Sequence, residues 1–152
     1  YKRQILALSR QGLPAIRDES SSENLTKKGG YILKNANGKR DVTLIASGSE
    51  VEIALEAFEK LKKININSKV ISVPCFDIFE KQSDNYKKEI LGENTFKVSI
   101  EASSQSGWKN IVGENGITLG MTTFGKSGPY KEVYKLFNLT SDEVVKIVSK
   151  NV

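Results

Sequence analysis

The chain has 152 residues, of which 38% are hydrophobic and 27% are charged, and its net charge is +5. This length and mixture are typical of one ordinary globular domain with a core of its own. No apolar run approaches the ~18 residues that a membrane-spanning helix needs, and the lysines are mixed with acidic residues. We therefore expect neither a membrane nor a nucleic acid as a partner.

The chain contains one cysteine, Cys75, and no histidine. A single cysteine excludes an internal disulfide and is compatible with a reducing cytosol. The missing histidine removes Ser-His-Asp catalysis, the usual base for a nucleophilic cysteine and the commonest zinc ligand. We therefore interpret Cys75 as structural.

Residues 1–28 do not resemble the start of a compact domain. A short apolar strand, Ile5–Leu8, precedes the polar, Ser-rich stretch Arg17–Glu23, which is typical of a linker. The strand has no obvious partner in this chain, which begins with Tyr1 rather than Met. We expect residues 1–28 to be the end of a preceding domain with its linker, and residues 29–152 to form a domain of their own.

Two strands follow in close succession. Gly29–Lys34 predicts a short strand closed by the turn Asn35–Gly38. Val42–Ala46 is nearly continuous in apolar residues, which is typical of a strand covered on both faces. Because only a turn separates the two strands, we expect them to pair antiparallel, with the first at a sheet edge.

The Val42–Ala46 strand leads into a long amphipathic helix. Ser47–Ser49 interrupts the apolar run, and apolar side chains then recur at the spacing of one helical face up to Lys63. Ser49 and Glu52 have the spacing of a capping box at the helix start. A buried strand that leads into such a helix is half of a β-α-β unit, the building block of a parallel sheet.

The remaining elements alternate in the same way. Further strands are predicted at Ser68–Val73, Phe96–Ala102 and Ile117–Leu119, and helices at Asp77–Leu91 (one or two), Gly107–Val112, Pro129–Phe137 and from a cap at Thr140 or Ser141 to the end. This order predicts an α/β fold: a three-layer sandwich with a mostly parallel sheet of about five strands, one antiparallel edge strand, and helices on both faces.

One stretch matches a nucleotide-binding pattern. Gly120–Ser127 fits the phosphate-loop expression G-x-x-x-x-G-K-[ST] letter by letter. That loop works only if a helix opens at its Lys, whereas Gly128-Pro129 falls within the first turn such a helix would need. Few residues remain after it for further strands or a metal-binding Asp. We therefore interpret the match as accidental.

Three other positions are candidates for binding. Ser47–Ser49 could hold an anion on free amides at a helix start, but without a G-x-G-x-x-G pattern a self-capped turn is favoured. Glu101 ends a strand, where α/β sites often form, yet the sequence places no second carboxylate or base beside it. Arg10 ends the first strand, where its planar fork could bind a phosphate, a carboxylate or a neighbouring domain.

Four stretches together resemble one enzyme family. They are Leu8-Ser9-Arg10-Gln11 with Leu13-Pro14, then Gly29–Leu33, then Ala46–Val51, and finally Gly120–Pro129. In this order and at this spacing they resemble transketolase, over essentially the whole chain. The similarity is to its C-terminal portion: the end of the middle, pyrimidine-binding domain and the complete third domain. Lys126 stands where that family accepts other residues, which favours the accidental reading of the phosphate-loop pattern.

The resemblance implies a function for the parent enzyme. Transketolases are cytoplasmic homodimers that move a two-carbon ketol unit from a ketose phosphate to an aldose phosphate. They use thiamine diphosphate and a divalent metal (Mg or Ca), which the N-terminal and middle domains hold. The resemblance implies that Arg10 binds the phosphate of the sugar substrate. It also implies that this segment contains no catalytic residue, binds no cofactor or metal, and is inactive alone.

Two other interpretations stay open at this point. One is a free-standing regulatory module that binds an anion or nucleotide through Ser47–Ser49 or Gly120–Ser127. The other is the equivalent domain of a different thiamine diphosphate enzyme, such as a 2-oxo acid dehydrogenase β chain or deoxyxylulose phosphate synthase. Within this group, Thr122-Thr123-Phe124-Gly125 and Ser9-Arg10-Gln11 favour transketolase.

Overall fold

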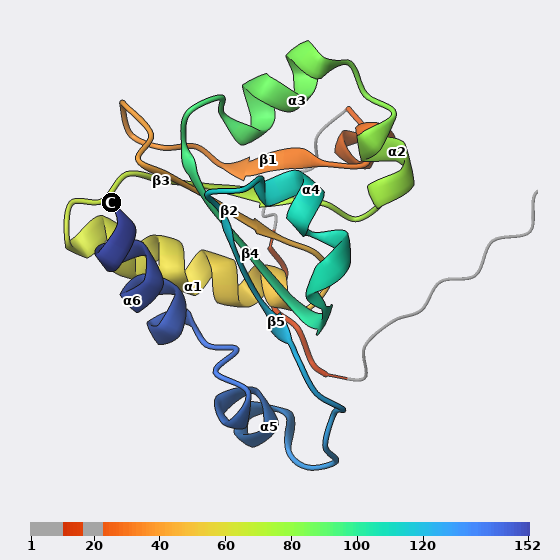
Figure 1. The fold of residues 1–152 in the computed structure, drawn as a ribbon, viewed down its shortest axis with the longest axis vertical. Coiled ribbons are helices and arrows are strands. Elements are labelled where there is room, and N and C mark those ends of the chain that lie inside the picture. Colours follow the sequence, from red (N-terminus) through yellow and green to blue (C-terminus); the bar gives the residue numbers. More distant parts are fainter. Residues whose placement is uncertain (1–10, 17–22) are drawn as a thin grey trace, which may run out of the picture.

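The computed structural model describes residues 11–16 and 23–152 of the chain (Figure 1). Its strands are β1 Tyr31–Lys34, β2 Val42–Ala46, β3 Ser68–Ser72, β4 Phe96–Ser104 and β5 Ile117–Met121. Its α-helices are α1 Glu50–Lys63, α2 Phe76–Glu80, α3 Asp84–Leu91, α4 Lys109–Val112, α5 Tyr130–Leu136 and α6 Ser141–Asn151, and the short 3-10 helices are η1 Leu25–Lys28 and η2 Gln105–Gly107.

Within the described residues the strands form one sheet in the order β1-β3-β2-β4-β5. β2 pairs in parallel with β3 and β4, and β4 pairs in parallel with β5, while β1 runs antiparallel at one edge. The predicted five-stranded, mostly parallel sheet with one antiparallel edge strand is confirmed. The stretch 77–91 forms two short helices, α2 and α3.

The predicted partner of the edge strand is wrong. β1 pairs with β3, with Tyr31 opposite Ser72 and Lys34 opposite Val70, rather than with β2. The physical reason is that both edges of β2 are already occupied, by β3 on one side and β4 on the other. The outer edge of β3 therefore receives β1, although β2 follows β1 directly in the chain.

Helices cover both faces of the sheet, which completes the predicted three layers (Figure 1). α1 and α6 lie on one face, where they pack on alternate β2 residues including Val42 and Leu44. On the opposite face, Ile45 packs with the cluster formed around α2, α3 and α4. Every residue of β2 is buried, and this two-sided burial explains its continuous apolar run. None of the described helices has the length and hydropathy that crossing a membrane requires.

Candidate functional site

The carboxyl ends of β2 and β4 meet where the strand order of the sheet reverses. The chain passes from β2 through α1 to β3 on one side, and later returns as β4 on the other side of β2. In open α/β sheets, sites usually form in this crevice. Here the Oγ of Ser47, which follows β2, donates a hydrogen bond of 2.7 Å to Oε2 of Glu101 on β4. The candidate positions Ser47 and Glu101 thus lie in direct contact.

Glu101 occupies surroundings that disfavour its charge. Burial is the largest cause that raises the pKa of its carboxyl group, and the negative charge of Glu50 raises the pKa further. The hydrogen bond from Ser47 acts in the opposite direction. The sequence placed no second carboxylate beside Glu101, and the structure brings Glu50 close enough to affect its ionisation.

This pKa shift predicts a pH-dependent stability. The folded chain binds the Glu101 proton more tightly than the unfolded chain does. Protonation of Glu101 therefore stabilises the folded chain below the ordinary pKa of 4.5, and this stabilisation is lost as the pH rises through the raised pKa of the folded chain. Glu101→Gln, which keeps an acceptor without the charge, should therefore gain stability relative to the parent chain between about pH 4 and about pH 7. Urea unfolding of both chains across that range measures the difference.

The control for this experiment is Glu80→Gln, at an exposed position on α2. Its free energy of unfolding should differ from that of the parent by less than about 0.5 kcal/mol, the usual range for a surface substitution. If the difference in unfolding free energy between Glu101→Gln and the parent stays constant with pH, the raised pKa of Glu101 is wrong.

Ser49 does not cap α1 in the predicted way. It already has helical dihedral angles (φ −67°, ψ −28°), and its side chain makes no capping hydrogen bond. Its Oγ instead donates to Oε1 of Glu50 at 2.9 Å. The predicted capping box between Ser49 and Glu52 is therefore wrong, because the hydroxyl group serves the neighbouring carboxylate. Ser47–Ser49 does form a tight turn, in which the Glu50 amide donates to the Ser47 carbonyl oxygen at 3.2 Å. The predicted self-capping of this turn is wrong, because the hydroxyl groups of Ser47 and Ser49 bond to the carboxyl groups of Glu101 and Glu50.

Glu50 is a buried carboxylate with two hydroxyl partners. Only 3% of the residue is exposed. The hydroxyl of Tyr134 on α5 donates to the same Oε1 that Ser49 contacts, and the two hydroxyl oxygens lie 3.4 Å apart. Burial and this hydrogen bond raise the pKa of Tyr134, so its hydroxyl group remains a donor. The bond joins the start of α1 to α5.

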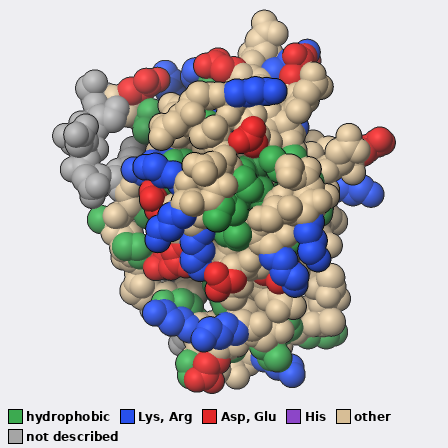
Figure 2. Space-filling model, turned by 90° about the vertical axis from the view of Figure 1, so that its left-hand side faces the viewer, with side chains coloured by type: hydrophobic (Ala, Val, Ile, Leu, Met, Phe, Trp, Pro, Cys, Tyr) green, Lys and Arg blue, Asp and Glu red, His purple; other side chains and the backbone are tan. Residues whose placement is uncertain are grey.

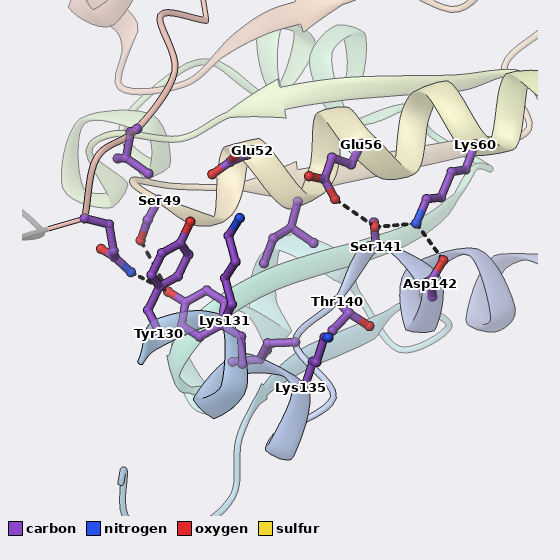
Figure 3. Close-up of a pocket in the computed structure, with 15 residues that line it drawn as sticks. Ser49, Glu52, Glu56, Lys60, Tyr130, Lys131, Lys135, Thr140, Ser141 and Asp142 are labelled. Carbon is purple, nitrogen blue, oxygen red and sulfur yellow. Dashed lines mark hydrogen bonds and ion pairs between the residues drawn. The ribbon is translucent and has the colours of Figure 1, made fainter. Parts of the chain in front are cut away.

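A groove of about 270 Å³ lies beside this contact, between α1, α5 and the start of α6 (Figure 3). Gln11 and Leu13, from the described stretch 11–16, form part of its wall. The rings of Tyr130 and Tyr134 meet edge to face, with centroids 6.0 Å apart. In Figure 3, Tyr130 and Lys131 point from α5 toward α1.

At its other end the groove is closed by a polar network, shown by the dashed lines in Figure 3. Ser141 Oγ donates to Glu56 Oε2 at 3.0 Å and accepts from Lys60 Nζ at 2.9 Å. Lys60 also lies 2.6 Å from Asp142, but side-chain exposures of 40% and 84% make this ion pair weak. These groups satisfy one another across α1 and α6, so this end of the groove is a joint between helices.

The phosphate-loop match lacks the structure it would need. Gly120 belongs to β5, while Lys126 lies in an exposed loop. The next helix begins at Tyr130, four residues after that Lys, so no helix N-terminus faces the loop amides. Arg10, the predicted phosphate-binding residue, lies outside the described residues.

The charged side chains show no concentration of one sign on the face drawn in Figure 2, where Lys and Arg alternate with Asp and Glu. Such a mixture is typical of a solvated surface. Among the described residues, no group of three or more His, Cys, Asp or Glu side chains is placed to hold a metal ion.

Sequence reasoning missed Glu50 and Tyr134. An acidic residue in the first turn of a helix is ordinarily explained by the helix dipole, so Glu50 gave no signal of burial. Tyr134 lies 84 positions away from it in the chain. An aromatic residue on a short helix is usually a packing residue, and only the three-dimensional structure shows where its hydroxyl group lies.

The chain is similar in sequence to transketolases. Residues 29–140 match the family described as "Transketolase-like TK C-terminal domain". The chain is 43% identical to transketolase from Sinorhizobium medicae and 44% identical to the chloroplastic transketolase of Solanum tuberosum. Both alignments cover 93% of this chain, and they cover 20% and 19% of those two relatives. The chain thus spans about a fifth of the length of the curated relatives it matches.

The fold is similar as well. The crystal structure of transketolase from Pichia stipitis in complex with sedoheptulose 7-phosphate superposes with a TM-score of 0.82 at 35% identity. The match covers 93% of this chain and 20% of that one. Transketolase from Campylobacter jejuni superposes with a TM-score of 0.74 at 28% identity.

Proposed function

The chain belongs to the transketolase family, as its C-terminal domain, and from this membership we propose that it is part of an enzyme that transfers a two-carbon ketol unit from a ketose phosphate to an aldose phosphate. The observation that carries the proposal is the family match over residues 29–140. The sugar phosphate in the Pichia stipitis complex supports the substrate class.

The proposal assigns the cofactor to other parts of the enzyme. Thiamine diphosphate would act as the carrier of the ketol unit, with a divalent metal (Mg or Ca) at its diphosphate. Neither group fits the described residues, since no cluster of metal-ligating side chains is present and the Gly120–Ser127 loop lacks a helix at its Lys. We propose that the N-terminal and middle domains of the enzyme, a cytoplasmic homodimer, hold both groups, and that this segment alone is inactive.

Within this enzyme the segment would have a mainly structural role. We propose that residues 29–152 are the C-terminal domain and that residues 1–28 are the end of the middle domain with its linker; the family match beginning at residue 29 supports this boundary. The helix-covered sheet would pack against the other domains. Arg10 would supply a substrate contact from this chain, through a charge-assisted bond to the sugar phosphate.

The role of Arg10 predicts a selective loss of activity. In the full-length enzyme, Arg10→Ala should remove about 1.5–3 kcal/mol of transition-state stabilisation for phosphorylated sugars, which lowers their kcat/KM roughly tenfold or more. Unphosphorylated sugars should be affected far less, because they lack the group that Arg10 contacts. Steady-state kinetics with matched phosphorylated and unphosphorylated ketoses measures both effects. Equal losses for the two substrate types would refute the assignment.

A further inference from the structure

We propose that Asn37 is a site of spontaneous covalent modification, where loss of ammonia converts the side chain to aspartate and isoaspartate through a succinimide ring. Asn37 lies in the turn that the sequence predicts at Asn35–Gly38. This turn belongs to the connection from β1 to β2, which projects beyond the end of the sheet in Figure 1. The reaction involves no substrate of the enzyme, so it is independent of the proposed function.

The reaction joins two groups that adjoin in the chain. The backbone nitrogen of Gly38 attacks the side-chain carbonyl carbon of Asn37, and the new C–N bond closes the ring as the side-chain nitrogen leaves with the amide proton as ammonia. Water then opens the succinimide at one of its two carbonyl carbons. Opening at the side-chain carbonyl gives aspartate, whereas opening at the main-chain carbonyl gives isoaspartate, in which the chain continues through the side-chain carbon. Either product adds a carboxylate and lowers the net charge of +5 by one unit.

The backbone at Gly38 is free to reach the geometry that ring closure needs. Asn37 is exposed, and within the described residues the amide of Gly38 makes no hydrogen bond. Gly38 has φ +99°, and a Cβ added to it would meet nothing within 4 Å. Since glycine has no side chain to obstruct the attack and rotates more freely than other residues, its nitrogen can approach the Asn37 carbonyl carbon.

The same dipeptide occurs once more in the chain, at Asn115-Gly116, where the structure holds the backbone in place. Asn115 is also exposed, so access of water does not distinguish the two sites. The amide of Gly116, however, donates to the carbonyl oxygen of Gly113 at 3.3 Å. A Cβ added to Gly116 would lie 2.5 Å from both the Cβ and the carbonyl oxygen of Val112, which is 4% exposed. Ring closure at Asn115 therefore requires this turn to break beside the start of β5.

The test follows the full-length enzyme as it ages, folded in neutral buffer and unfolded in guanidinium chloride. Trypsin places the two sites on separate peptides, residues 35–39 and 110–126. Liquid chromatography with mass spectrometry separates the asparagine, aspartate and isoaspartate forms of each peptide. Ageing in water labelled with heavy oxygen marks the carboxylates that form during the incubation, which distinguishes them from those that form during digestion.

The two sites should react at comparable rates in the unfolded chain, where each is an exposed Asn-Gly step. In the folded enzyme, Asn37 should react within about threefold of its unfolded rate, because no structure has to open first. Asn115 should react at least about tenfold more slowly when folded than when unfolded, because its hydrogen-bonded and packed turn opens only transiently. Folding thus selects one of two identical dipeptides for modification.

Asn37→Gln assigns the reaction to one side chain, because the peptide 35–39 also contains Asn35. Glutamine keeps an exposed amide but closes a larger ring far more slowly, so labelled carboxylate should disappear from this peptide. Label that persists in the variant would place the reaction at Asn35 and overturn the proposal. So would an Asn37 that reacts in the unfolded chain but not in the folded enzyme. Equal rates at Asn37 and Asn115 in the folded enzyme would overturn the selection by the backbone.

Discussion

Trp108→Ala is expected to lower the free energy of unfolding of this domain by about 3–5 kcal/mol, the range for removing a large aromatic side chain from a core. Trp108 is 2% exposed and belongs to the cluster between the sheet and α2, α3 and α4. Its ring meets Phe76 edge to face, with centroids 4.5 Å apart. Truncation would leave a cavity that the short helices around it cannot fill without losing their own contacts.

Urea unfolding of the 152-residue chain measures this loss, and Phe124→Ala provides the control. Phe124 is also aromatic but is 96% exposed, in the loop between β5 and α5. Its truncation should change the unfolding free energy by less than about 0.5 kcal/mol. Similar losses at the two positions would mean that the cluster around Trp108 does not stabilise the fold.

Gly29→Ala is the second substitution with a large expected effect. Gly29 has φ +78°, a conformation that costs a residue with a side chain about 1–3 kcal/mol. An added Cβ would also lie 2.4 Å from the backbone nitrogen of Phe79 and 2.5 Å from the carbonyl oxygen of Cys75. These backbone atoms belong to α2 and its N-cap and are bonded to each other at 3.1 Å, so the clash can be relieved only by moving that helix. We expect a destabilisation clearly larger than the conformational cost alone.

Gly113→Ala separates the two causes. Gly113 also has a positive φ, +76°, and its ψ of −175° places it in a region that is essentially confined to glycine, so its conformational cost is at least comparable, but an added Cβ there meets nothing within 4 Å. Its substitution should therefore cost about 1–3 kcal/mol, from the backbone conformation alone. If chemical unfolding shows Gly29→Ala to be no more destabilising than Gly113→Ala, then the close approach of η1 to α2 is not a constraint on this fold.

The two Gly29 contacts also explain part of the family resemblance. The sequence shows a pair of glycines before β1 but gives no reason for them. In the structure, Gly29 ends η1 in a left-handed conformation. Gly30 lies against the ring of Phe79, and a Cβ added to Gly30 would lie 2.7 Å from the nearest ring atom. The glycines allow η1 and β1 to pass close to α2. A motif recognised from its letters thus has a steric cause.

The sequence by itself determined the elements and the fold class of this protein. The continuous apolar run of β2 indicated a strand covered on both faces, and the spacing of apolar residues indicated α1. Thr140 or Ser141 indicated the start of α6, where the side chain of Thr140 accepts from the amide of Glu143. These features are local, because strand and helix periodicities and caps depend on residues within a few positions of one another.

The tertiary structure alone decided which distant residues meet. It placed β1 on β3 because both edges of β2 were occupied. It also joined Glu50 to Tyr134 across 84 positions of the chain, and Glu101 to Ser47 across 54. Such contacts depend on which strand edges remain free and which helices share a face, and no short-range pattern in the sequence records either.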